Sequence, residues 1–241
     1  MTIKNNIDEL SFFLSQSHDC SYFPDRQAKS LFTSDSTPLT TEQYSKLNAL
    51  GFRRSGDYVY RPHCESCNEC TPARVPVHKF EFSRTQKRTF KHNQDLQSKL
   101  VPIQFEQEHY QLYERYINAR HADGSMFPAT PEQYQDFILY PYPFAHLVEF
   151  RLKQRLIAIA LIDILVDGLS AVYSFFDPKE EKRSLGSFII LWQIEEAKRR
   201  KLSYVYLGYW LKNCQKMSYK AKYRPIELRY FDNWRQVKLI D

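Results

Sequence analysis

Glycine is scarce in this sequence, at 6 of 241 residues. No G-x-x-x-x-G-K-[ST] or G-x-G-x-x-G segment occurs, which weighs against the phosphate loops of NTPases and dinucleotide-binding enzymes. Long apolar runs are missing as well: the longest, Leu156–Val166, is interrupted by Asp163 and is too short to cross a bilayer. The first residues, Met1-Thr-Ile-Lys4, contain no apolar signal core. These absences predict a cytoplasmic protein that does not bind membranes.

The composition is that of a globular protein, with 43% hydrophobic and 26% charged residues. A chain of this length can bury a core without a disulfide or a metal to hold it together. In a reducing cytoplasm its five cysteines are therefore expected to be thiols or metal ligands.

The chain changes character near residue 100. The first part is irregular and rich in Pro, Cys, Ser and Thr, which predicts a small Cys-containing domain over residues 1–98 and a second domain over 99–241. In the first part, Thr40 or Thr41 is a candidate N-cap for a helix that ends at Gly51. Short strands are predicted over 57–61 and 73–80, on either side of a cysteine-rich loop.

The second part has more regular patterns. Strands are predicted over 100–105, 145–151, 156–165, 170–176, 204–209 and 226–231, and helices over 106–120, from 131 to before 141, from 184 or 187 to about 200, and over 214–223. This order, β-α-α-β-β-β-α-β-α-β, is the order of the GNAT acyltransferase fold, so the predicted class is α+β with a mixed sheet.

In that fold a splayed strand and the start of the next helix hold the acyl carrier. The corresponding segments here are residues 173–177 and 183–186. Gly186 is the single glycine where coenzyme A users have a glycine-rich loop, which favours a donor without a pyrophosphate.

Three cysteines, Cys64, Cys67 and Cys70, lie in C-x-x-C-x-x-C spacing, with Cys20 upstream. A C-x-x-C turn lets two thiolates bind one metal ion. However, two separate C-x-x-C knuckles are not present, and a ferredoxin run would place its fourth cysteine where Arg74 stands. Two interpretations stay open: a metal or iron–sulfur site formed by these four cysteines, or a packed loop of reduced thiols.

The positive charge is concentrated in two stretches. Residues 197–226 contain nine Lys or Arg and no acidic residue, with six Tyr or Trp interleaved, and residues 74–91 contain a single acid, Glu81. Clustered cations bind phosphate backbones, and aromatic rings can stack on unpaired bases. The two stretches predict a nucleic-acid ligand.

Several long strings of residues resemble the arginyl-tRNA–protein transferase family. They cover nearly the whole chain and comprise Phe52-Arg-Arg-Ser-Gly56, residues 60–74, 82–88, 120–124, 170–178, 184–186 and 208–225. The short chain and the single upstream Cys20 resemble the bacterial branch of that family, the aspartate/glutamate leucyltransferases. The resemblance implies transfer of leucine from leucyl-tRNA to proteins with an N-terminal Asp or Glu, which marks them for degradation in the N-degron pathway, and it implies no cofactor for the chemistry.

On this interpretation Tyr173 and Asp177 are the candidate catalytic residues. The candidate substrate-binding residues are Arg74, Arg84, Arg88, Arg183, Ser184, Gly186, Tyr209, Trp210, Lys216, Lys220, Tyr223 and Arg224. The first three arginines are candidates for binding the acidic acceptor, because a guanidinium binds a carboxylate through two hydrogen bonds.

Three alternatives remain: arginine as the transferred residue, a coenzyme-A-dependent acetyltransferase, and an RNA-binding module without activity. An arginine donor would require a carboxylate in the pocket, whereas leucine would require an apolar one.

Overall fold

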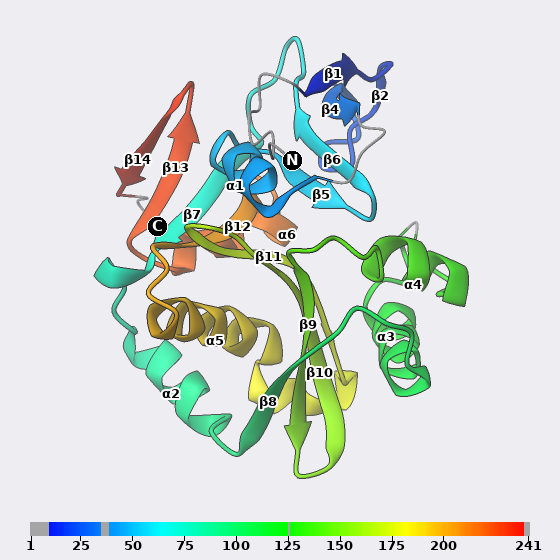
Figure 1. Ribbon diagram of the computed structural model, residues 1–241, viewed down its shortest axis with the longest axis vertical. Helices are drawn as coiled ribbons and strands as arrows, with labels where there is room; N and C mark the ends of the chain where they lie inside the picture. Colours follow the sequence, from blue (N-terminus) through cyan, green and yellow to red (C-terminus); the bar gives the residue numbers. More distant parts are fainter. Residues whose placement is uncertain (1–9, 35–38, 125, 239–241) are drawn as a thin grey trace, which may run out of the picture.

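The computed structural model describes residues 10–34, 39–124 and 126–238, and Figure 1 shows the arrangement of its elements. The strands are β1 (Ser11–Leu14), β2 (His18–Asp19), β3 (Gln27–Ala28), β4 (Ser30–Ser34), β5 (Arg53–Ser55), β6 (Tyr58–Pro62), β7 (Thr71–Pro76), β8 (Leu96–Val101), β9 (Ala145–Leu152), β10 (Arg155–Ile164), β11 (Gly168–Phe176), β12 (Tyr204–Trp210), β13 (Ile226–Tyr230) and β14 (Asn233–Val237). The α-helices are α1 (Thr41–Ala49), α2 (Arg84–His92), α3 (Gln107–Arg120), α4 (Pro131–Ile138), α5 (Leu185–Arg199) and α6 (Gln215–Ser218), and the 3-10 helices are η2 (Val77–Lys79), η3 (Pro178–Arg183) and η4 (Tyr219–Lys222).

An eight-stranded mixed sheet forms the centre, in the order β14-β13-β7-β12-β11-β10-β9-β8. Alternate residues of its strands point to opposite faces. Leu147, Ile159 and Leu161 pack with α3 and α4 on one face, while Val148 and Ala160 pack with α5 on the other. In Figure 1, α3 and α4 accordingly lie on one side of β9 and β10, and α5 lies on the other with α2 beside it. Both faces of the sheet are therefore buried.

The predicted α+β class with a mixed sheet is confirmed. The predicted order from residue 100 onward is also found, as β8, α3, α4, β9, β10, β11, α5, β12, α6 and β13. The strand expected over 100–105 is wrong in its bounds, because β8 spans Leu96–Val101 and ends before Pro102, which lacks the backbone N–H that a strand ladder uses. Within the described ranges, no helix has the length and apolar character needed to cross a membrane.

The division at residues 98 and 99 stays a prediction. β8 runs across this position, and β7, from the first part of the chain, lies in the large sheet between β12 and β13. The remaining early strands form a smaller sheet in the order β1-β4-β6-β5.

One pair of neighbouring strands, β11 and β12, is parallel and diverges. The two strands are paired over Gly168–Ser170 and Tyr204–Tyr206, and both continue beyond these residues without pairing to each other. Arg53 of β5 reaches into this divergence, where its Nη2 donates to the carbonyl of Ala171 on β11 at 2.9 Å. The smaller sheet thus supplies a side chain to the point where the large sheet opens.

A buried ion pair joins the two sheets. Arg54 of β5 donates to both carboxylate oxygens of Asp163 on β10, with its closest contact at 2.7 Å from Nη2 to Oδ1. Both side chains are fully buried. Burial lowers the pKa of Arg54 and the Asp163 carboxylate raises it, with a net rise above the ordinary value. The Arg54 guanidinium therefore stays charged, and its hydrogen bonds to Asp163 fix β5 against β10.

Candidate active site

A cavity of about 390 Å³ lies where β11 and β12 diverge. Its walls come from β5, β11, β12, α5 and the segment that contains α6 and η4. The lining residues are Tyr22, Tyr44, Arg53, Arg54, Tyr60, Tyr116, His121, Ser170, Ala171, Val172, Tyr173, Ser174, Ile189, Ile190, Gln193, Leu207, Gly208, Tyr209, Lys216, Met217, Tyr219 and Lys220. We call it the split cavity.

The split cavity combines apolar walls with polar groups that have no partner within the protein. Ile189 and Ile190 of α5 and Leu207 of β12 supply apolar surface. The hydroxyl of Ser170 and the Oε1 of Gln193 are buried without a hydrogen bond in the described structure. No Asp or Glu is among the lining residues. The cavity therefore suits a ligand that is partly apolar and carries hydrogen-bonding groups.

The two catalytic candidates lie in different places. Tyr173 lines the split cavity, and its ring packs edge-on against Phe137. Burial raises the pKa of its phenol, so the hydroxyl keeps its proton at neutral pH. Asp177, beyond the end of β11, does not line this cavity: it accepts a hydrogen bond from the backbone of Lys179 at 3.0 Å and pairs with Arg155 at 3.1 Å. Its visible contacts are structural.

The corner before α5 is built from ion pairs. Arg183 bridges Asp95 and Glu180, at 2.9 and 3.1 Å. Ser184 has a left-handed backbone, with φ 51°, and a Cβ added at Gly186 would contact the Phe176 ring at 3.4 Å. Arg183, Ser184 and Gly186 thus connect β11 to α5, and none of the three lines the split cavity.

The predicted basic helix after Cys214 contains both exposed and buried cations. Lys216 is exposed, and its Nζ lies 3.7 Å from Asp123. Lys220 is 3% exposed, and its Nζ donates to the carbonyl of Tyr209 and contacts Met217 Sδ at 3.1 Å. Burial and the charge of Arg53 lower the pKa of Lys220 to about 7. Lys220 is therefore part of the split cavity and not of an exposed charged surface.

Three aromatic candidates are mainly packing residues. The Tyr209 hydroxyl donates to the carbonyl of Gly51 at 2.9 Å. Trp210 packs with Ala73 and Ile226, and Tyr223 is buried against α5. Tyr209 also lines the split cavity, whereas Trp210 and Tyr223 do not.

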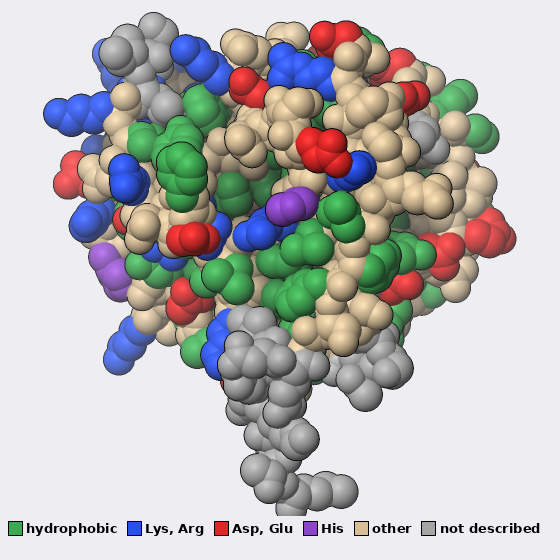
Figure 2. Space-filling model, turned by 90° about the horizontal axis from the view of Figure 1, so that it is seen from above, with side chains coloured by type: hydrophobic (Ala, Val, Ile, Leu, Met, Phe, Trp, Pro, Cys, Tyr) green, Lys and Arg blue, Asp and Glu red, His purple; other side chains and the backbone are tan. Residues whose placement is uncertain are grey.

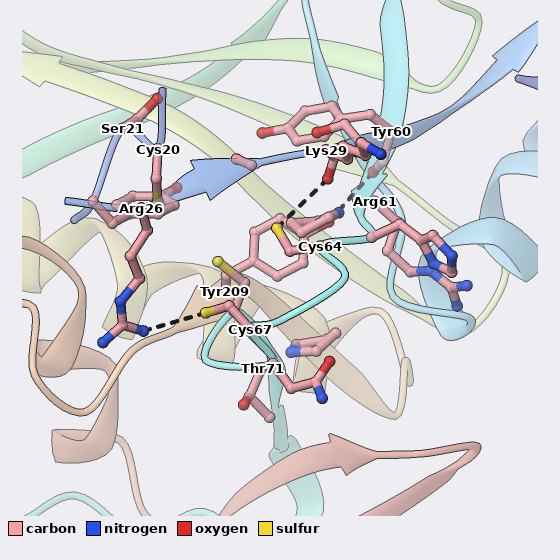
Figure 3. A pocket seen from close by; sticks show the side chains of 18 of the residues that line it. Cys20, Ser21, Arg26, Lys29, Tyr60, Arg61, Cys64, Cys67, Thr71 and Tyr209 are labelled. Atoms are coloured by element: carbon pink, nitrogen blue, oxygen red, sulfur yellow. Dashed lines mark hydrogen bonds between the residues drawn. The ribbon is translucent and has the colours of Figure 1, made fainter. Parts of the chain in front are cut away.

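The cysteine cluster lines a second cavity of about 520 Å³ next to the first (Figure 3). Tyr22, Tyr60 and Tyr209 line both cavities and so form the wall between them. Cys20, Cys64, Cys67 and Cys70 all line the second one. The four cysteines thus share the lining of one cavity.

The arrangement of these thiols does not fit a metal or an iron–sulfur cluster. Cys64 Sγ lies 3.7 Å from the carbonyl of Lys29, and Arg26 donates to Cys67 Sγ at 3.3 Å (Figure 3). Burial, and then the other three thiols, raise the pKa of Cys70 to about 12, which favours a protonated thiol. Across the residues that are described, no group of three or more His, Cys, Asp or Glu side chains is placed to hold a metal ion. The predicted metal site is therefore not supported by this arrangement.

The two basic stretches meet on the surface. Gln86 Nε2 of α2 donates to the carbonyl of Lys222 in η4 at 3.0 Å. The exposed cations of this combined surface, the α2–η4 surface, are Arg84, Lys87, Arg88, Lys91, Lys222 and Arg224. Arg74 is not among them, because it is buried, pairs with Glu227 at 2.8 Å and lies 3.5 Å from the centre of the Tyr204 ring. Figure 2 shows another face, hollowed near its middle, where Lys, Arg and His side chains border hydrophobic ones.

Sequence reasoning missed two residues of the split cavity. Arg53 and Gly208 both belong to strings that resemble the transferase family, yet neither was assigned a role. Gly208 has φ +79°, and a Cβ built on it would lie 3.5 Å from Arg53 Nε. The sequence does not reveal the positive φ of Gly208 or its contact with Arg53, which is 155 positions earlier; both require the structure.

Comparison with known proteins supports one family. The model of the N terminus of arginine-tRNA-protein transferase matches residues 18–88, and that of the C terminus matches residues 108–230. The aspartate/glutamate leucyltransferase of Pseudomonas fluorescens (strain Pf0-1) is 53% identical over 225 residues, which are 93% of this chain and 96% of that protein. The protein of the same name from Stutzerimonas stutzeri (strain A1501) is 52% identical over 95% of this chain and 97% of its own length. The crystal structure of FemX aligns with 88% of this chain and 82% of its own, at 8% identity and a TM-score of 0.49. The chain belongs to the arginine-tRNA-protein transferase family.

Proposed function

We propose that this protein transfers leucine from leucyl-tRNA to the α-amine of proteins that begin with Asp or Glu, and so marks them for degradation. Family membership and the relatives named aspartate/glutamate leucyltransferase support the reaction. The split cavity is the proposed place of the reaction, because it lies where β11 and β12 of the large sheet diverge and combines apolar walls with unpartnered polar groups.

The lining of the split cavity favours leucine over arginine as the transferred residue. Ile189, Ile190 and Leu207 offer apolar surface to a leucine side chain. A buried arginine side chain would require a carboxylate, and neither Asp nor Glu lines this cavity among the described residues.

The chemistry needs few groups from the protein. The α-amine of the acceptor attacks the ester carbonyl of leucyl-tRNA, an amide bond forms, the ester bond breaks, and the proton lost by the nitrogen goes to the 3′-terminal ribose oxygen. The ester is already activated, and an α-amine with a pKa of about 7.7–8.0 is partly neutral at pH 7. The protein's contribution is orientation, with the Tyr173 hydroxyl, which keeps its proton, as the candidate hydrogen-bond donor to the leaving oxygen.

A transfer assay tests the function directly. The purified chain is incubated with leucyl-tRNA that carries radiolabelled leucine and with a peptide that begins with Asp. We expect label on the peptide, little label on a matched Asn peptide, and weak transfer from arginyl-tRNA. Acetylation of the peptide from acetyl-CoA, or tRNA binding without any transfer, would contradict the proposal and favour one of the alternatives.

The α2–η4 surface is proposed to bind the tRNA backbone. Replacing Arg88 and Lys222 by Glu should weaken tRNA binding. The fall of log affinity with log salt should also become less steep by about 1–2, because binding releases fewer counterions when two phosphate contacts are lost. The matched control replaces Lys153 and Lys182, two exposed lysines elsewhere, by Glu. Both variants lower the net charge equally, so equal losses of affinity would show a general charge effect and refute a specific surface.

A further inference from the structure

Two buried cations in the split cavity have no carboxylate partner. The buried Lys and Arg side chains of the described structure are Arg53, Arg54, Arg74, Lys220 and Arg229. Three of them are paired with a carboxylate: Arg54 with Asp163, Arg74 with Glu227 and Arg229 with Asp232. The remaining two, Arg53 and Lys220, both line the split cavity, and no described Asp or Glu forms an ion pair with either. The cavity thus concentrates positive charge that the protein itself leaves uncompensated.

Neutral groups of the protein hold both cations in place. Arg53 Nη1 donates to Asn48 Oδ1 at 3.0 Å, and its Nη2 donates to the carbonyl of Ala171 at 2.9 Å. Lys220 Nζ donates to the carbonyl of Tyr209. Burying a charge without an opposite charge is costly. An arrangement that holds two of them in one cavity is suited to an anion that arrives with the substrate.

One edge of the Arg53 guanidinium is open to such an anion. Its Nε has no described hydrogen-bond partner, and Gly208 leaves free the position where a Cβ would lie 3.5 Å from Nε and 3.7 Å from Nη2. Ser170, fully buried on the same cavity wall, has a hydroxyl without a partner. The free N–H groups and the hydroxyl are donors of the kind that a carboxylate accepts.

We propose that Arg53 and Lys220 bind the side-chain carboxylate of the acceptor's N-terminal Asp or Glu and thereby select acidic acceptors. This assignment rests on the proposed function and replaces Arg74, Arg84 and Arg88 as the acceptor-binding residues. Arg74 already has Glu227 as its partner, and Arg84 and Arg88 are exposed on α2, outside the split cavity.

A carboxylate fits this position better than a phosphate of the tRNA. Arg53 and Lys220 are 8% and 3% exposed, so an anion must enter the cavity to reach them. A side-chain carboxylate ends a short chain and can enter alone, whereas a backbone phosphate carries a ribose on each side. A phosphate can reach exposed cations, such as Lys216 and those of the α2–η4 surface, without entering the cavity.

The main test compares Lys220→Met, which keeps the length of the side chain and removes its charge, with wild type and with Lys220→Arg. The readout is kcat/KM for paired peptides that begin with Asp or Asn. Lys220→Met should lower the Asp-to-Asn ratio by about 30-fold or more, as expected for the loss of a buried charged partner, with tRNA affinity unchanged. Lys220→Arg should retain most of the preference.

An unchanged Asp-to-Asn ratio of kcat/KM in Lys220→Met would overturn the proposal. If that ratio were unchanged and leucyl-tRNA bound more weakly, Arg53 and Lys220 would be assigned to a tRNA phosphate instead.

Peptide binding to the chain without tRNA separates this proposal from the proposed function. An Asp peptide should bind wild type more tightly than an Asn peptide, and Lys220→Met should remove the difference. This result would stand even if no leucine were transferred. Equal binding of the two peptides to wild type would refute the acceptor site while leaving the transfer reaction to be judged by its own assay.

A pH profile of wild type gives a measurement that needs no cavity variant. The Lys220 ammonium loses its charge above about pH 7 in the free protein, and a bound carboxylate would favour the charged form. The ratio of Asp to Asn peptide affinity should therefore be constant below pH 7 and fall above it. The other groups that face Lys220 are Arg53, Tyr209, Tyr219, Cys70 and Cys214. A Cys214→Ser profile identifies any thiol contribution, and a ratio that does not change between pH 6 and 9 would contradict a role for Lys220.

Discussion

Replacing Asp163 by Asn should destabilise the protein by about 3–5 kcal/mol, because the change leaves the Arg54 guanidinium charged and buried without its partner. Both side chains are fully buried and joined through two guanidinium nitrogens. Since β5 and β10 belong to different sheets, the loss should loosen the contact between the sheets as well as local packing. Urea unfolding of wild type and variant measures the free-energy difference.

Two controls separate the buried charge from a general loss of an acidic residue. Glu181→Gln removes the exposed ion-pair partner of Arg120. The Arg120 side chain is 43% exposed and that of Glu181 is 71% exposed, so the free energy of unfolding should change by less than about 1 kcal/mol. The double variant Arg54→Met with Asp163→Leu replaces the pair by apolar groups and should recover much of the loss. A loss for Asp163→Asn no larger than that for Glu181→Gln would show that the pair does not hold the sheets together.

Filling the split cavity at Gly208 should lower leucine transfer by on the order of 10²-fold, because small misplacements of reacting groups have effects of this size. Gly208→Asn adds a side chain beside Arg53 at a backbone φ of +79°. Asn accepts left-handed conformations better than other residues with a side chain, so the fold should be retained. The measurements are kcat with a saturating Asp peptide and the free energy of unfolding.

Gly208→Ala is the matched variant at the same position. Ala occupies less of the cavity than Asn, but its backbone is more strained there, at a cost of about 1–3 kcal/mol. If filling causes the loss, Asn should be the less active and the more stable of the two. The reverse order of activities would attribute the effect to backbone strain instead of blocked access.

Much of the fold could be predicted because its regular elements have strong patterns and clear ends. The helix from Gln107, the strands from Arg155 and Gly168 and the helix from Leu185 bury one face or both, so their apolar residues recur with the right period. By contrast, α2 contains no buried residue, and Phe90 is its single apolar side chain. The sequence feature that indicates this helix is the capping box formed by Ser83 and Gln86. A prediction based on the spacing of apolar residues does not detect it.

The candidate site was harder to predict because charge along a sequence does not reveal burial. Lys220 and Lys222 are two positions apart in the same basic stretch, yet one is inside the split cavity and the other is on the surface. Asp163 was visible as an interruption of an apolar run, but its partner Arg54 is 109 positions away. The four cysteines line one cavity, but their spacing alone did not determine whether they bind a metal.

The position of β7 has a consequence for folding during synthesis. Its two neighbours in the large sheet are made much later: Tyr206 of β12 follows Arg74 by 132 positions, and Glu227 of β13 follows it by 153. At 5–20 residues per second, a growing chain waits roughly 7–26 s before β12 has been made. Ala73 and Val75, which end fully buried, stay without their final neighbours during this time. The nascent protein thus carries an apolar, unpaired strand until translation is nearly complete, and its sheet closes as one of the last events of its synthesis.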